Sequence, residues 1–158
     1  YPDVLGPDKK LTIKTPKPYW QPGWLKQHDR IMTAMSGMKG RAPLVVSGDM
    51  HAIALGKMLR SGANDFSRNP ITVALSGTGG TRPLGWPSAG FRGTPATPSQ
   101  VLDFQEEVKP LELHGFTLVD FTPDKIVLQQ FRWDVRSQPV EAIDTLQPFH
   151  TAELPRPA

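Results

Sequence analysis

The residues best suited to chemistry are a carboxylate and an imidazole that follow a short apolar run. In Ala42-Pro-Leu-Val-Val-Ser-Gly-Asp-Met-His-Ala52 the apolar residues end at Ser47-Gly48, and Asp49 and His51 follow, one residue apart. Asp supplies a hard anionic oxygen, and neutral His supplies a nitrogen ligand for iron, zinc or manganese. Residues i and i+2 of an extended backbone project to the same side. The spacing therefore predicts that both side chains serve one metal site.

The tripeptide Asp49-Met-His51 also has a purely structural interpretation, in which Asp49 caps the next predicted helix and His51 is a surface residue. The context favours a functional interpretation, because the pair follows a predicted strand. Ligands of open α/β sheets gather beyond the carboxyl ends of the strands. Gly48 lets the chain turn sharply there and lets a ligand approach the backbone.

Four elements are predicted around this motif. Apolar spacing predicts a helix from Trp24 to Met38 and a buried strand from Leu44 to Ser47, which we expect to have parallel neighbours. A second helix is predicted from Ala52 to Arg60, and a second strand from Ile71 to Leu75. The order helix, strand, helix, strand indicates an α/β fold.

The last third of the chain has a different pattern. Residues 115–121 and 125–133 are strand-like, and Thr122-Pro123-Asp124 between them is a turn signal, so we expect an antiparallel hairpin. Residues 76–100 form a long segment rich in Gly, Pro, Ser and Thr. We expect one domain over residues 1–158, with irregular termini at residues 1–22 and 151–158.

Composition narrows the classes of function. The 158 residues suffice for one domain with a core, and 17 prolines and 14 glycines predict long loops. The net charge of +3 is spread along the chain without a basic and aromatic stripe, which argues against nucleic-acid binding. No apolar run approaches the roughly 20 residues of a membrane span. There is no cysteine, and the chain begins with Tyr1, so we expect it to be processed or cut from a longer protein.

Several blocks together resemble the alkaline phosphatase D (PhoD-like) metallophosphoesterases. Ser47-Gly-Asp-Met-His51 is similar to the Ser-Gly-Asp-x-His element of that family. The resemblance covers roughly residues 20 to 135 and includes three further blocks, His114-Gly-Phe-Thr-Leu-Val-Asp-Phe-Thr-Pro-Asp124 with Phe131-Arg-Trp-Asp134, Gly85-Trp-Pro-Ser88 and Phe91-Arg-Gly-Thr94.

The resemblance implies part of a four-layer α/β/β/α sandwich with a two-metal site at strand ends, which hydrolyses phosphate monoesters or diesters. Asp49 and His51 would be ligands, each to a different metal. The implied cofactors are iron with calcium or manganese, with zinc as a further option, and the implied compartment is periplasmic or extracellular. The family's earlier ligand motifs are missing, so the chain resembles the C-terminal part of the catalytic domain and would need an N-terminal half or a partner chain.

Other residues have weaker claims to a role. Arg82 and Arg92 could contact phosphate as bidentate donors, or form surface salt bridges instead. The amides of Ser76-Gly-Thr-Gly-Gly-Thr81 could bind an anion, although a simple turn is the alternative. The remaining histidines and the tryptophans are interpreted as packing or solvated residues: His28, His114, His150, Trp24, Trp86 and Trp133.

Two non-enzymatic hypotheses stay open. The chain could be a catalytically incomplete structural or binding fragment that pairs with another chain. It could also be a phosphate- or nucleotide-binding module built on the Gly-rich loop, in which case anion binding would not depend on His51.

Overall fold

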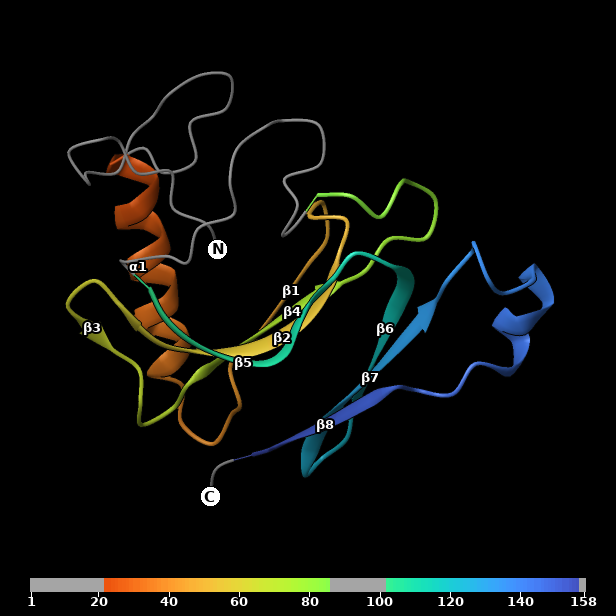
Figure 1. The fold of residues 1–158 in the computed structure, drawn as a ribbon. Coiled ribbons are helices and arrows are strands. Elements are labelled where there is room, and N and C mark those ends of the chain that lie inside the picture. Colours follow the sequence, from red (N-terminus) through yellow and green to blue (C-terminus); the bar gives the residue numbers. More distant parts are fainter. Residues whose placement is uncertain (1–21, 86–101, 157–158) are drawn as a thin grey trace.

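The computed structural model describes residues 22–85 and 102–156. Within them lie one α-helix, one 3-10 helix and eight strands (Figure 1). In chain order these are α1 (Pro22–Ser36), β1 (Leu44–Ser47), β2 (Ile53–Ser61), β3 (Asn64–Asp65), β4 (Ile71–Ser76), β5 (Leu102–Leu111), β6 (His114–Phe121), β7 (Lys125–Trp133), η1 (Val140–Thr145) and β8 (His150–Pro155).

The strands form two sheets. The first has the order β1-β4-β2, and β2 also pairs with β3 and β5; β1 and β4 are parallel, and the other pairs are antiparallel. The second is the antiparallel sheet β6-β7-β8. Helix α1 lies on one side of the first sheet and the second sheet on the other (Figure 1). The described part of the chain is therefore mostly β, with one mixed and one antiparallel sheet.

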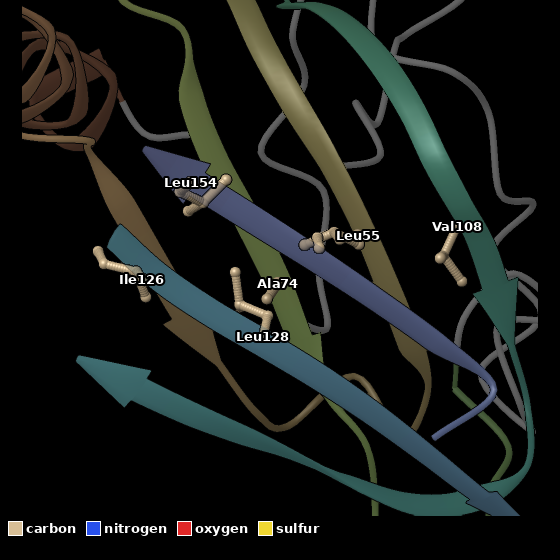
Figure 2. Close-up of a cluster of buried hydrophobic side chains, with 7 residues drawn as sticks. Leu55, Ala74, Val108, Ile126, Leu128 and Leu154 are labelled. Atoms are coloured by element: carbon tan, nitrogen blue, oxygen red, sulfur yellow. The ribbon is translucent and has the colours of Figure 1, made fainter. Parts of the chain in front are cut away.

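Two buried clusters hold these layers together. The cluster between the sheets joins Leu55, Ala74 and Val108 to Ile126, Leu128 and Leu154 (Figure 2). The cluster under α1 consists of Met32, Met58, Phe66, Ile71, Val73 and Leu102. The first sheet is thus covered on both faces, and burial of its apolar side chains is the main stabilising contribution.

Most predicted elements near the motif are confirmed. The helix, the strand at 44–47, its parallel neighbour at 71–76 and the hairpin at 114–133 are all present. In the hairpin turn, Thr122 N donates to Lys125 O at 2.9 Å, and the Thr122 hydroxyl accepts a hydrogen bond from Lys125 N.

The prediction of a helix from Ala52 to Arg60 is wrong, because these residues form most of β2. Leu55 faces the second sheet and Met58 faces α1, so apolar residues occur on both faces of the strand. A strand buried on both faces loses its alternating pattern and can imitate helical spacing. With this helix gone, the predicted α/β alternation of helices and strands fails.

The two ends of the described chain differ in their secondary structure. The prediction of an irregular C-terminal segment is wrong for residues 151–155, which belong to β8 and pair with β7. The predicted irregular N-terminus lies outside the described residues, apart from Pro22, which begins α1. Residues 86–100 of the Gly/Pro-rich segment also lie outside them.

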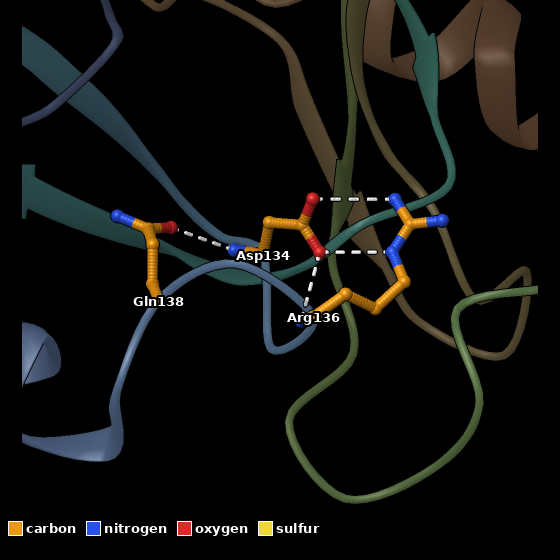
Figure 3. A network of polar contacts seen from close by, with 3 residues as sticks. All are labelled: Asp134, Arg136 and Gln138. Carbon is orange, nitrogen blue, oxygen red and sulfur yellow. Dashed lines mark hydrogen bonds and ion pairs between the residues drawn. The ribbon is translucent and has the colours of Figure 1, made fainter.

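A polar turn follows β7 (Figure 3). The Asp134 carboxylate accepts hydrogen bonds from Nε and Nη2 of Arg136 at 3.0 and 3.2 Å, and Asp134 N donates to Gln138 Oε1 at 2.8 Å. The guanidinium lowers the pKa of the Asp134 carboxyl below its usual value and raises the pKa of Arg136 in return. These contacts fix the start of the connection from β7 to η1.

Candidate functional site

Parallel pairing of β1 and β4 brings the ends of both strands to one edge of the first sheet. Ser47 is opposite Leu75, one residue before β4 ends at Ser76. The Ser76 hydroxyl donates to the Ser47 carbonyl at 3.2 Å, which ties the two ends together. The segments after both strands, residues 48–52 and 77–85, therefore leave the sheet side by side.

The turn that carries Asp49 and His51 has an unusual backbone. Asp49 has a φ of 66° and His51 a φ of 53°, both in the left-handed region, and they are the positive-φ residues other than glycine in the described chain. Met50 N donates to Gly48 O at 2.8 Å, so residues 48–50 form a γ-turn centred on Asp49. The expectation of an extended backbone at this point is therefore wrong. Left-handed residues other than glycine cluster at functional sites, where surrounding contacts maintain the strain.

The two candidate ligands differ in exposure. Asp49 is exposed, and His51 is half-buried. Within the described residues no three or more Asp, Glu or His side chains come together in a group that could hold a metal ion. A structural or catalytic metal takes about four ligands, three or four of them from protein. Asp49 and His51 alone therefore do not fit a complete metal centre.

A third segment reaches the same edge. The end of β5 is held at this edge by the pairing of Leu111 with Ile53, the first residue of β2. Glu112 follows, and its Oε1 accepts a hydrogen bond from Gly85 N at 2.8 Å. Sequence reasoning missed Glu112, because a single Glu between two strands carries no motif.

The Gly-rich loop packs on the second sheet. Gly115 N donates to Thr78 O at 3.0 Å, and the hydroxyls of Thr78 and Thr81 lie 2.7 Å apart. The Thr78 hydroxyl is thus engaged within the loop. Arg82 is exposed on the same segment, whereas Arg92 lies outside the described residues.

One polar atom at the edge has no partner. Ser47 Oγ is buried and makes no hydrogen bond within the described part of the chain. The same holds for Oε1 of Gln130, a fully buried residue of β7 whose Nε2 donates to Ala54 O at 3.1 Å. Unpaired buried acceptors cost stability. Neither atom was singled out from the sequence, because nothing in residue order shows where a hydroxyl or amide points.

The other histidines lie away from this edge or in packing positions. His28 Nδ1 is 3.2 Å from Asp29 Oδ1 on α1. His150 Nε2 is 3.0 Å from Glu107 Oε1, a contact between β8 and β5. The ring of His114 lies 5.8 Å from that of Trp133, whose indole N–H donates to Pro139 O. Trp86 lies outside the described residues, and only the backbone of Trp24 is described, in α1.

Comparison of the chain with protein-family models, with curated proteins and with solved structures gave no match. The described residues include no helix that is long and apolar enough to cross a membrane.

Proposed function

We propose that the chain is part of a metal-dependent phosphoesterase of the alkaline phosphatase D type and contributes two metal ligands, Asp49 and His51. The observation that carries this proposal is the strained turn that presents both residues at the carboxyl ends of the parallel strands β1 and β4. Left-handed residues other than glycine are uncommon and concentrate at functional sites, so two of them at a sheet edge support a role for these side chains.

The proposed fold is part of a four-layer α/β/β/α sandwich. The support for this proposal is that α1, the first sheet and the second sheet follow one another in the order of three such layers. The fourth layer would cover the outer face of the second sheet. Phe116 and Leu118 of β6 lie on that face and are 39% and 52% exposed, so apolar surface is available for such a cover.

The proposed cofactors are two metal ions, iron with calcium or manganese, or zinc. Such ions supply Lewis acidity for the hydrolysis of a phosphate monoester or diester. Since the described residues offer only two ligands, the remaining ligands would come from an N-terminal half or a partner chain. Arg82 and Arg92 are proposed to contact the phosphate, and the resemblance favours a periplasmic or extracellular location.

A second candidate is an incomplete fragment that serves only as a structural or binding unit. The observation that favours it is β1, which pairs with β4 on one side and with no described strand on the other. A four-residue apolar edge strand of this kind invites pairing with another strand. Both candidates thus require a partner segment, and they differ in whether the completed assembly binds metal.

The first testable prediction concerns the two ligands. The protein, expressed with all of the sequence that its gene encodes, is assayed on a nitrophenyl phosphate monoester and diester with manganese, calcium or ferrous ions. Asp49→Ala and His51→Ala should each lower activity by more than about 100-fold, because loss of a ligand costs more than loss of a residue that only orients one. Metal content, measured by elemental analysis, should fall in parallel.

Asp144→Ala is the matched control, since Asp144 is exposed on η1. It should retain wild-type activity and metal content. Wild-type metal content and activity in His51→Ala would overturn the assignment. An assembly that binds its partner without metal would favour the structural candidate.

A further inference from the structure

Gly85 lies directly against the turn that carries the two candidate ligands. A Cβ atom at Gly85 would lie 2.4 Å from the Met50 carbonyl oxygen and 3.2 Å from Cβ of His51. Only glycine allows the backbone to approach so closely. The segment after β4 therefore passes close to the Met50–His51 peptide.

Glu112 holds Gly85 in this place. Its Oε1 accepts the hydrogen bond from Gly85 N at 2.8 Å, and the side chain is half-buried. Hydrogen bonds to a carboxylate are about twice as strong as those between neutral groups. Because Glu112 directly follows β5 and β6 begins two residues later, the carboxylate is fixed to strands of both sheets. The contact therefore anchors a loop to the frame of the fold.

The turn depends on support from outside. The hydrogen bond from Met50 N to Gly48 O closes the turn around Asp49, but it does not include His51. A left-handed residue other than glycine persists only where its surroundings determine its conformation. A Cβ at Gly85 would meet both the Met50 carbonyl and Cβ of His51, so the Gly85 backbone passes close enough to provide that support.

We propose that Glu112 is a positioning residue, which acts through Gly85 to set the orientation of His51. The chain of contacts runs from the carboxylate to the Gly85 amide, and from the Gly85 backbone to the Met50–His51 peptide. The consequence for metal binding rests on the proposed function, whereas the coupling between Glu112 and His51 does not.

The experiment compares wild type with Glu112→Ala, Glu112→Gln and Glu106→Ala by nuclear magnetic resonance, without added metal. In Glu112→Ala the Gly85 amide should exchange with solvent at least about tenfold faster, the factor implied by loss of a hydrogen bond to a charged group. The imidazole signals of His51 should shift. Glu112→Gln keeps an acceptor oxygen and should restore both values toward wild type. Glu106 is an exposed residue of β5, and its replacement should change neither.

Unchanged His51 signals in Glu112→Ala would overturn the proposal, and so would an equal shift in Glu106→Ala. If Glu112→Ala does not fold, Gly85→Ala supplies the test, because the added methyl group must displace the Met50 carbonyl and shift the His51 signals. The readout is a ring signal rather than activity. The two proposals can therefore fail separately. If the His51 signals respond to Glu112→Ala but His51→Ala binds metal like wild type, the positioning role of Glu112 is supported and the proposed phosphoesterase function is overturned.

Discussion

At the scale of single residues, Gly77 decides how closely the loop after β4 packs on the second sheet. Its φ is 98°, and a Cβ there would lie 2.4 Å from the Gly115 carbonyl oxygen. Gly77→Ala should therefore lower the free energy of unfolding by more than about 2 kcal/mol, since backbone strain of about 1–2 kcal/mol adds to the steric overlap. Urea unfolding measures the change.

Gly62→Ala is the matched control for this prediction. Gly62 also has a positive φ, 57°, but a Cβ at that position meets nothing within 4 Å. It should cost only the backbone strain, about 1 kcal/mol. Equal losses in the two variants would mean that the contact between Gly77 and Gly115 contributes nothing.

The same scale shows what the sequence could predict of the site. The position of Asp49 and His51 beyond a strand end followed from residue order, and parallel pairing of that strand confirms the placement. Their left-handed backbone did not follow, because residue order does not show that the distant Gly85 passes close to this turn. Glu112 was equally hidden, since it acts on a backbone amide 27 residues away.

At the scale of elements, a partly buried hydrogen bond ties α1 to β2. The Ser61 hydroxyl donates to Asp29 Oδ1 at 2.6 Å, and Ser61 is fully buried. Asp29→Ala removes the acceptor and leaves the hydroxyl buried without this partner, so the free energy of unfolding should fall by about 1–3 kcal/mol. Thermal or urea unfolding of Asp29→Ala, Ser61→Ala and the double variant measures the coupling.

The sum of the losses in unfolding free energy of the two single variants should exceed the loss of the double variant by at least about 0.5 kcal/mol, because the two side chains share one interaction. Strictly additive losses would show that this hydrogen bond does not stabilise the packing of α1 on β2.

The type of a secondary-structure element was predictable wherever apolar periodicity and turn residues indicated the same element. The helix and the hairpin were predicted correctly because their periodicity and turn residues agree. β2 was mistaken for a helix because it is buried on both faces. Gly56 in the middle of that run was the available warning, since glycine disfavours a helix, and it leaves room for Phe104 of β5, whose ring would lie 2.3 Å from a Cβ there.

At the scale of the whole molecule, the core between the sheets is open along one side in the part of the chain that the structure describes. This side is bordered by β1 and β6, which are edge strands of the two sheets. The Thr117 hydroxyl donates to Ser76 O, which places β6 over β4, while the contact of His150 with Glu107 places β8 over β5.

Val46 of β1 shares a face with Leu44, which packs on the cluster between the sheets, yet Val46 is 47% exposed. Phe121 of β6, opposite the buried Ile126, is 66% exposed. Residues on the inner faces of the sheets are thus exposed at this margin, as expected where a partner segment completes the sandwich.

This open margin predicts self-association of the isolated chain through β1, because an apolar edge strand without charge is a template for pairing. Val46→Lys places a charge on the exposed position and should shift the chain toward monomer, with a change in unfolding free energy of only about 0.5 kcal/mol. Val45→Lys is the matched control: Val45 packs on the cluster under α1, so a charge there should cost about 2 kcal/mol or more without protecting the edge. Sedimentation velocity over a range of concentrations, together with thermal unfolding, separates the two effects. If Val46→Lys sediments like wild type at every concentration, β1 is not the surface that a partner completes, and the further ligands that the proposed function requires would have to reach Asp49 and His51 from another side.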